Sequence, residues 1–359
     1  MFDKSNCTLK KLDIVVSPNS FSDVCAGATS IITRIKDWKP DDIGFELLTG
    51  GFTNHLVKCY LKNNPDEAVL IRIYGENTEL IIDRDLEVRN LQIMCEAGFC
   101  APLHCLFTNG LCYDFTPGEV LDIKMVRDPD ISKLIATKLA RMHSIHRNVD
   151  GIDSQDSIFP FLYKLFHQIP ESFPDPVKDL RYKSLIGPKD KLKEEIDCLK
   201  AHLLKTESPI VFCHNDLLLR NIIYNNEKKE VTFIDFEYAG YNYQAFDIGN
   251  HFCEFSGVAN FDPNLYPSKD FQINWLKIYL EAWYIENKLN PKDITEEEIE
   301  KFYIIVNKFA LAAHLYWGIW ALIQSAYSKL ELDYLKYAKL KLDQYFSRKE
   351  EFLSLEFKS

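Results

Sequence analysis

The most chemically informative stretch of this 359-residue chain is VFCHNDLLLRNIIYNNEKKEVTFIDF, residues 211–236. It places two carboxylates and an amide in order, at Asp216, Asn221 and Asp235. A carboxylate can accept the proton of an attacking hydroxyl, while a second carboxylate and an amide oxygen are ligands that Mg²⁺ prefers. Phosphoryl transfer needs such groups because it depends on positioning and on charge neutralisation. We therefore expect a phosphotransferase that uses ATP and Mg²⁺, with these three catalytic residues and with Asn221 and Asp235 as the metal ligands.

The local pattern predicts the elements that would position these groups. The tripeptide His-Asn-Asp at 214–216, followed by Asn221, has the H-x-D-x-x-x-x-N spacing of kinase catalytic loops. Two short apolar runs joined by Asn-Asn predict a hairpin over 222–234, which would deliver Asp235 at its end. A chance tripeptide beside an ordinary strand end is the alternative. It does not explain why all these features follow one another in this order.

The upstream half offers counterparts for a nucleotide. Residues 47–57, LLTGGFTNHLV, predict a strand, a glycine turn and a strand, a form that lets backbone N–H groups approach phosphates; a plain hairpin is the alternative. Arg72 interrupts the apolar run 68–75, and Glu87 on the following helix would hold it, unless the two form an ordinary surface ion pair. The nucleotide-binding residues expected in this half are Gly50, Gly51, Thr53, Asn54, Arg72 and Glu87.

The hydrophobic pattern changes near Pro117 from mainly strands to mainly helices. Strands are predicted at 45–48, 55–61, 68–75, 103–108 and 110–115, and helices at 21–38, 78–97, 131–146 and much of 270–346. Asn77 or Thr78 is the expected N-cap of the second helix. We expect an α+β fold with a small β-rich N-terminal lobe and a larger, mainly helical C-terminal lobe. The expected parts are a weakly ordered lead (1–20), a nucleotide-binding lobe (21–117) and a catalytic, amine-binding lobe (118–359).

Composition narrows the class of protein. The chain carries 42 Lys and Arg against 53 Asp and Glu, a net charge of −11, which disfavours nucleic acid and anionic membranes as partners. Residues 309–328 carry no formal charge and approach the length of a membrane span, but His, Gln and two Trp within them favour a buried helix. Ten cysteines without a CxxC pair, behind a charged N-terminus, predict reduced thiols and a cytoplasmic protein.

Longer motifs resemble one family. GGFTN (50–54), VLIRIYG (69–75), HNDLLLRNIIY (214–224) and WGIWALIQ (317–324) occur in the order seen in choline/ethanolamine kinases. The run from Ile234 through Glu254, IDFEYAGYNYQAFDIGNHFCE, closely resembles the signature of that family. The resemblance covers most of the chain and implies a protein-kinase-like fold and phosphorylation of an amino alcohol.

The resemblance also implies roles for individual residues. Asp114 and Phe115 would lie on the strand beside adenine, and Asp247 would orient the catalytic loop. The residues implied to bind the amine substrate are Asp216, Tyr238, Glu254, Trp317, Trp320 and Tyr337. A carboxylate and aromatic faces attract an ammonium group, although the spacing of the two Trp alone would also suit a helix core. Leu332 stands where the family usually has an aromatic residue.

Within the family, the motifs favour ethanolamine over choline. Leu218 replaces the Gln that typically follows the catalytic Asp of choline kinases, and GGFTN replaces their GGMSN. We therefore expect ethanolamine to become phosphoethanolamine, the first step of the CDP-ethanolamine route to phosphatidylethanolamine. A choline or dual-specificity kinase is the alternative. Because family members are often dimeric, a homodimer is a further expectation.

Other classes fit less well. An aminoglycoside phosphotransferase would share the catalytic scaffold, whereas a protein kinase is disfavoured because Asp-Phe-Glu at 235–237 replaces Asp-Phe-Gly. An inactive amine- or nucleotide-binding module is the alternative from another class. The presence of Asp216, Asn221 and Asp235 together argues against it.

Overall fold

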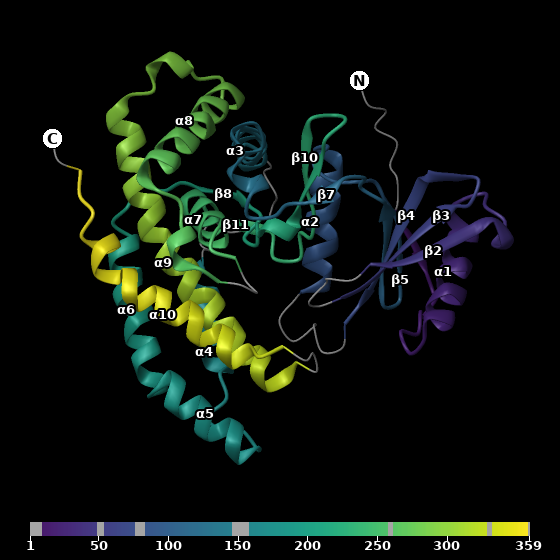
Figure 1. The fold of residues 1–359 in the computed structure, drawn as a ribbon, viewed down its shortest axis with the longest axis horizontal. Helices are drawn as coiled ribbons and strands as arrows, with labels where there is room; N and C mark the ends of the chain where they lie inside the picture. The colour runs from purple at the N-terminus through teal and green to yellow at the C-terminus, as the bar shows by residue number, and fades with distance from the viewer. Residues whose placement is uncertain are drawn as a thin grey trace. The chain divides into compact units, whose positions relative to one another are not determined.

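The computed structural model describes residues 9–48, 54–75, 83–145, 158–257, 261–328 and 332–357. The chain divides into two compact units, Met1–Gly118 and Glu119–Ser359. Among the described residues, the first unit consists mainly of strands with two α-helices, and the second mainly of helices (Figure 1). This confirms the predicted α+β fold class.

The first unit is built on a six-stranded sheet with the strand order β1-β5-β6-β4-β3-β2. β1 runs parallel to β5, and the other pairs are antiparallel. Its strands are β1 (Lys10–Leu12), β2 (Ile43–Leu48), β3 (Asn54–Leu61), β4 (Asn64–Tyr74), β5 (Leu103–Phe107) and β6 (Gly110–Asp114), and its helices are α1 (Phe21–Ile35) and α2 (Arg84–Glu96). The buried stripe of α1 and the central strands share one hydrophobic core.

One expectation about this unit, the weakly ordered lead, is wrong. Residues 1–20 are not simply a weakly ordered lead, because Lys10–Leu12 pair with β5 and Val16 is fully buried in the core. The N-cap of α2 is Asp83, whose carboxylate accepts hydrogen bonds from the N–H groups of Asp85 and Leu86. The expected cap at Asn77 or Thr78 falls outside the described residues.

The second unit contains the long helices and two small sheets. Its helices are α3 (Pro129–His143), α4 (Ile158–Gln168), α5 (Pro176–Ile186), α6 (Lys189–Leu203), α7 (Gln244–Glu254), α8 (Lys269–Glu286), α9 (Glu296–Tyr327) and α10 (Tyr334–Leu353). Its strands are β7 (Glu119–Val120), β8 (Ile210–Cys213), β9 (Ile222–Asn225), β10 (Glu230–Phe233) and β11 (Gly240–Tyr243). β7, β9 and β10 form one sheet, and β8 pairs with β11.

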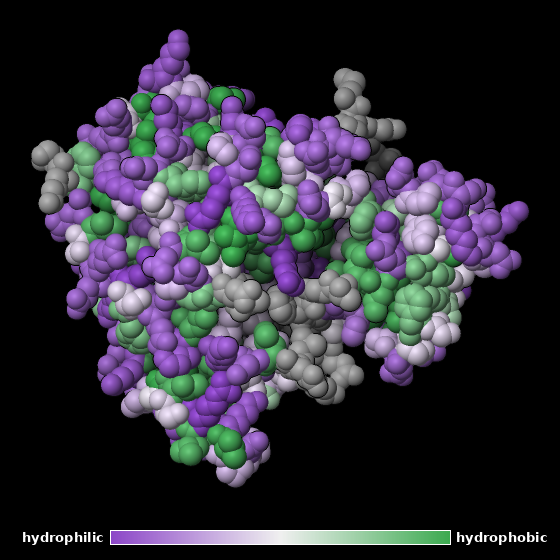
Figure 2. Space-filling view, in the orientation of Figure 1, coloured by the Kyte–Doolittle hydropathy of each residue, from purple (hydrophilic) through white to green (hydrophobic). Residues whose placement is uncertain are grey.

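Helix α9 is the central support of this unit. It packs against α7, α8 and α10, and Gly249 lets α7 approach closely, because a Cβ there would lie 2.7 Å from the Val306 carbonyl oxygen. Among the described residues, α9 alone is long and apolar enough to cross a membrane, and 83% of its most apolar window is buried. Hydrophilic residues dominate the face of the helical unit drawn in Figure 2. The apolar segment 309–328 is therefore covered by protein, as a buried helix requires.

Candidate active site

The catalytic loop lies between β8 and the β9–β10 hairpin, and Asp247 fixes its start. The Asp247 carboxylate accepts hydrogen bonds from the backbone N–H groups of His214 (2.7 Å) and Asn215 (2.8 Å). Asn215 adopts a positive φ of 63°, which Asn tolerates better than most residues. Asp247 therefore holds the backbone next to Asp216, which is the orienting role expected for it.

Asp247 is itself held by a second buried layer. His143 Nε2 donates to Asp247 at 2.9 Å, and His143 Nδ1 shares a hydrogen bond with the Tyr279 hydroxyl at 2.6 Å. Burial raises the pKa of Asp247, but the hydrogen bond and charge of His143 outweigh it, and the pKa ends below its ordinary value. Sequence reasoning missed His143 and Tyr279, since a single His or Tyr on an apolar helix face carries no distinguishing signal.

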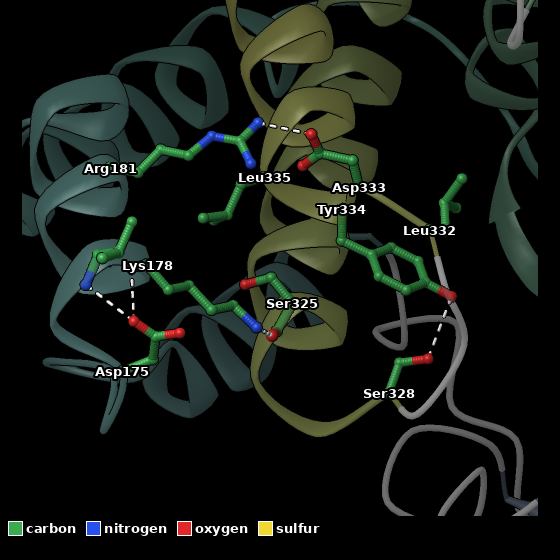
Figure 3. A pocket seen from close by; sticks show the side chains of 10 residues that line it. Asp175, Lys178, Arg181, Ser325, Ser328, Leu332, Asp333, Tyr334 and Leu335 are labelled. Atoms are coloured by element: carbon green, nitrogen blue, oxygen red, sulfur yellow. Dashed lines mark hydrogen bonds and ion pairs between the residues drawn. The ribbon is translucent and has the colours of Figure 1, made fainter.

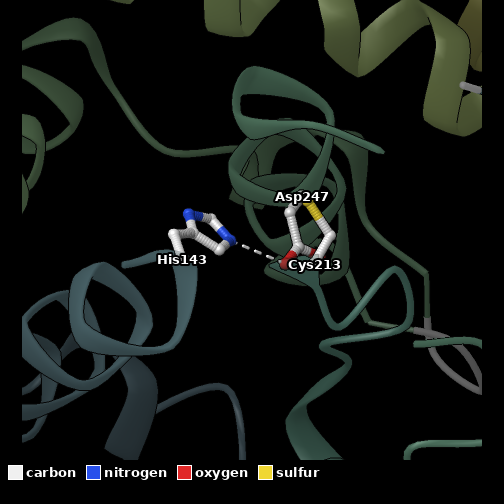
Figure 4. Close-up of side chains that lie close together, drawn as sticks. All are labelled: His143, Cys213 and Asp247. Atoms are coloured by element: carbon white, nitrogen blue, oxygen red, sulfur yellow. Dashed lines mark hydrogen bonds and ion pairs between the residues drawn. The ribbon is translucent and has the colours of Figure 1, made fainter. Parts of the chain in front are cut away.

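The His143–Asp247 pair also lies beside the Cys213 thiol, at a spacing that could suit a metal ion (Figure 4). All three side chains are buried. Burial raises the pKa of Cys213 well above its ordinary value, and the Asp247 charge adds to this, so the thiolate that metals require is disfavoured. Asp247 is already occupied by three donors. We therefore interpret this cluster as support for the catalytic loop.

Asp216 and Asn221 form one hydrogen-bonded pair. Asn221 Nδ2 donates to the Asp216 backbone oxygen (2.8 Å) and to its Oδ2 (3.1 Å). Burial raises the pKa of Asp216 well above its ordinary value, and the negative charges of Asp235, Glu254 and Glu237 raise it further. The structure thus gathers four carboxylates, an arrangement that favours cations as ligands.

The donor set fits Mg²⁺. Because the NH₂ end of Asn221 faces Asp216, its carbonyl oxygen is the end available to a metal. The Asn221 backbone oxygen accepts from Ile234 N–H at 2.9 Å, which ties Asn221 to the hairpin end that carries Asp235. Asp235 has a positive φ of 65°, a costly conformation that is typical of functional positions. A carboxylate and an amide oxygen are hard ligands suited to Mg²⁺.

Three aromatic residues predicted to bind the amine lie together. The Tyr238 and Trp317 ring centroids are 5.4 Å apart, as are those of Trp317 and Trp320, each pair nearly perpendicular. Trp320 Nε1 donates to the Tyr238 hydroxyl at 3.0 Å. Trp317 Nε1 donates to Asn250 Oδ1 at 2.8 Å, and Asn250 Nδ2 donates to the Asn215 backbone oxygen at 3.2 Å. This aromatic cluster is therefore connected to the catalytic loop through Asn250.

Glu254 is also predicted to bind the amine, and it has a partner that sequence reasoning missed. Lys341 Nζ donates to Glu254 Oε1 at 2.7 Å, and the two side chains are only 1% and 6% exposed. The same ammonium lies 5.5 Å from the Tyr337 ring centroid. A usable signal existed, since Lys341 occupies the helical stripe formed by the buried Ala338 and Tyr345.

Leu332 is an exposed residue just before α10. It is 39% exposed and lines a pocket of about 300 Å³ between α5 and the facing ends of α9 and α10 (Figure 3). The polar groups around that pocket are paired with one another, as in the Arg181–Asp333 ion pair at 2.7 Å. Tyr334 also lines the pocket, and its ring packs against Trp320 at 5.9 Å. Tyr334 therefore contacts both the pocket and the aromatic cluster, while the described lining of the pocket contains none of the residues predicted for catalysis or for the amine.

In the first unit, Arg72 and Glu87 form the expected ion pair. Arg72 Nη1 lies 3.0 Å from Glu87 Oε1, and the side chains are 3% and 0% exposed, so this is not a surface pair. Arg84 Nη1 donates to the other Glu87 oxygen at 2.7 Å. The guanidinium of Arg72 is therefore fixed in direction by a buried carboxylate.

The other residues predicted for the nucleotide are less informative. Gly50, Gly51 and Thr53 lie outside the described residues, and Asn54 begins β3. The Asp114 carboxylate contacts His104 Nε2 at 2.5 Å and Lys36 Nζ at 3.7 Å. The Lys58 ammonium lies 4.5 Å from the Phe115 ring centroid. Adenine binding by Asp114 and Phe115 stays a prediction.

The fold and the catalytic loop define a phosphotransferase of the protein-kinase-like class. A choline kinase of Cryptosporidium parvum superposes with a TM-score of 0.74 at 21% identity, over 91% of this chain and 95% of that one. The family model for choline/ethanolamine kinase matches residues 45–346, and the chain belongs to that family.

Relatives named as ethanolamine kinases resemble the chain over nearly its whole length. Ethanolamine kinase 1 of Mus musculus is 45% identical over 347 residues, which are 96% of this chain and 95% of the relative. The solved structure of an ethanolamine kinase of Plasmodium vivax has a TM-score of 0.80 at 26% identity, covering 92% of this chain and 90% of that one.

Proposed function

We propose that this protein transfers the γ-phosphoryl group of ATP to the hydroxyl of ethanolamine, giving phosphoethanolamine and ADP. The observation that carries the proposal is the connection of two groups of residues. Asp216 and Asn221 are paired in the catalytic loop. Asn215 of the loop is hydrogen-bonded to Tyr238 and to Asn250, which holds Trp317, so the loop is connected to an aromatic cluster suited to an ammonium. The 45% identity to a relative named ethanolamine kinase supports the choice of substrate.

The residues of the second unit have separate tasks in this reaction. Asp216 accepts a hydrogen bond from the substrate hydroxyl and takes its proton as the oxygen bonds to phosphorus and the bond to ADP breaks. Asn221 and Asp235 would hold Mg²⁺, which neutralises phosphate charge when it is bound. Asp247 keeps the loop backbone in place through two buried hydrogen bonds. The cations of the complex favour the ionised form of Asp216 because they offset its neighbouring carboxylates.

In the first unit, Arg72 would pair with the nucleotide phosphates. Its guanidinium is permanently charged and is oriented by Glu87. We assign the nucleotide-binding role to residues 21–117 and the catalytic and amine-binding role to residues 118–359.

Choline is the second candidate substrate, because aromatic faces bind a methylated cation. Ethanolamine is favoured because its primary ammonium has three N–H donors that can reach carboxylates such as Glu254, whereas choline has none. Phosphorus NMR of the protein with Mg²⁺, ATP and each amine tests both candidates. The absence of phosphoethanolamine with ample enzyme would refute the proposal, and better turnover of choline would change only the substrate.

Three further proposals concern the setting of the reaction. The product would enter phosphatidylethanolamine synthesis, and the enzyme would work in the cytoplasm, where its cysteines stay reduced. We also propose a homodimer. Fractionation of an expressing cell and light scattering of the purified protein test the last two.

A further inference from the structure

Helix α10 carries two lysines in opposite environments, only two positions apart. Lys339 is 42% exposed and pairs with Asp343 at 2.6 Å, which is an ordinary surface ion pair. Lys341 is 1% exposed, and its ammonium is held by Glu254. A surface pair of this kind contributes little to stability because water screens it. A buried ammonium instead carries a desolvation penalty that apolar residues of similar size would avoid.

The buried ammonium stays charged. Burial lowers the pKa of Lys341, but the Glu254 carboxylate outweighs burial, with help from Tyr337 and Cys253, and the pKa ends above its ordinary value. Glu254 and Lys341 thus form a resident ion pair. The Lys341 ammonium contacts a carboxylate and an aromatic ring, the two kinds of group that an ammonium substrate also needs.

The surroundings explain why a cation is needed here before substrate arrives. Glu254 acts electrostatically on Asp216, which also has Asp235 and Glu237 as neighbours. A buried carboxylate among others, without a cation, favours its protonated form. A neutral carboxylic acid loses its charge attraction for an ammonium group. Lys341 is placed to prevent that loss.

We propose that Lys341 is a positioning residue for the amine substrate: its ammonium keeps Glu254 ionised and holds one carboxylate oxygen, so that ethanolamine binds without releasing a proton. This proposal rests on the proposed function. It names a specific task for a residue that would not itself touch the reacting atoms. The distinguishing property is the proton balance of amine binding.

Four titratable groups around the pair keep one protonation state near neutral pH. Burial lowers the pKa of His251 to about 4 and that of His314 well below its ordinary value. Burial raises the pKa of Cys253 to about 12 and that of Tyr337 above its ordinary value. These four groups therefore keep their protonation state between about pH 6 and 8. The groups that face the pair are Asp216 from the catalytic loop, His251 and Cys253 from α7, His314 from α9, and Tyr337 and Arg348 from α10.

The experiment compares Lys341→Met with wild type at saturating Mg²⁺ and ATP, measuring kcat and KM for ethanolamine from pH 6 to 8. Without the lysine, Glu254 binds a proton that ethanolamine must displace. KM of Lys341→Met should therefore rise as pH falls, by up to about tenfold per pH unit relative to wild type, for one linked proton. The double variant Glu254→Gln/Lys341→Met should have a high KM without this added pH dependence. Lys339→Met is the matched surface control and should follow wild type.

Further variants test whether charge is the cause. Lys341→Arg keeps the charge and should follow the wild-type profile, whereas Lys341→Gln should behave like Lys341→Met. If Lys341→Met does not fold, the comparison of Lys341→Arg with Lys341→Gln tests the role of the charge in its place. Calorimetry of ethanolamine binding in buffers of different ionisation enthalpy should show proton release in Lys341→Gln and none in wild type.

Parallel KM profiles for wild type and Lys341→Gln would overturn the proposal, as would an equal acid rise in Lys341→Arg. Wild-type turnover of ethanolamine at pH 8 is measured first. If that turnover is absent, the proposed function fails, and if it is present with a flat Lys341→Gln profile, only the role of Lys341 fails.

Discussion

Asp247→Asn tests how much the buried support of the catalytic loop contributes to the stability of the fold. The Asp247 carboxylate accepts two backbone N–H groups, at 2.7 and 2.8 Å, and His143 Nε2 at 2.9 Å, in a fully buried setting. Asn offers one oxygen, so at least one of these donors loses its acceptor, at a cost of about 1–3 kcal/mol. The remaining hydrogen bonds lose their charge assistance. We expect a total loss of about 3–5 kcal/mol, typical of a broken buried pair.

Urea denaturation and thermal melting of the full chain measure this loss. A loss of that size should lower Tm by roughly 10 °C in a unit of this size. The matched control is Asp343→Asn, which breaks only the exposed pair with Lys339 and should cost at most about 1 kcal/mol. An Asp247→Asn variant within 1 kcal/mol of wild type, or no less stable than the control, would refute the reasoning.

The same variant makes a prediction about acid stability. The folded pKa of Asp247 lies below the ordinary value of 3.8, so its contribution to stability is fully present above that value. The contribution is lost as pH falls below 3.8 through the folded pKa, because the unfolded chain then binds the proton more readily. The difference in stability between wild type and Asp247→Asn should therefore shrink in that range. A difference that stays constant down to pH 2 would contradict this.

Three further predictions concern activity. Asp216→Asn should lower kcat strongly and leave ATP binding largely intact. Asp235→Asn should lower kcat and also weaken Mg²⁺-dependent nucleotide binding. Near-normal turnover of both variants would disprove the site assignment. The kcat/KM of wild type should be at least about tenfold higher for ethanolamine than for choline, or ~1.4 kcal/mol. Glu254→Gln should lower kcat/KM more for ethanolamine, and Trp320→Ala should lower it more for choline. Equal wild-type efficiency with choline would overturn that preference. Trp317→Phe keeps an aromatic ring but removes the donor to Asn250, which is itself hydrogen-bonded to the catalytic loop. Steady-state kinetics should therefore show a fall in kcat, whereas a change in KM alone would argue against the connection.

The sequence predicted the elements with strong local patterns. The strands expected at 45–48, 55–61 and 110–115 correspond to β2, β3 and β6, and the uncharged segment 309–328 lies almost entirely within α9. Alternating burial and short turns are local properties, so a single chain reveals them. The lead was misjudged because β1 has only three residues, and its partner β5 lies more than 90 positions away.

The sequence predicted those residues of the candidate site that belong to a local motif. It did not predict those that reach the site through contacts between distant parts of the chain. Asp216 and Asn221 are five positions apart, whereas the partners of Glu254 and Asp247, namely Lys341 and His143, lie 87 and 104 positions away. A lysine in a helix is normally predicted to be exposed, unless the apolar residues three and four positions away show that it lies on the buried face. The buried stripe of α10 was therefore the missed signal.

Asn215 connects the residues proposed to bind the amine with the proposed catalytic base. Its backbone N–H donates to Asp247, and its backbone oxygen accepts from Asn250, which also holds Trp317. Its side-chain NH₂ donates to the Tyr238 backbone oxygen at 2.9 Å. The residue before the proposed base is therefore bonded to the loop anchor and to Tyr238, and it is connected to Trp317 through Asn250. Because a displaced ring would shift this backbone, a poorly fitting amine should lower kcat as well as raise KM, which places part of the substrate discrimination in the chemical step.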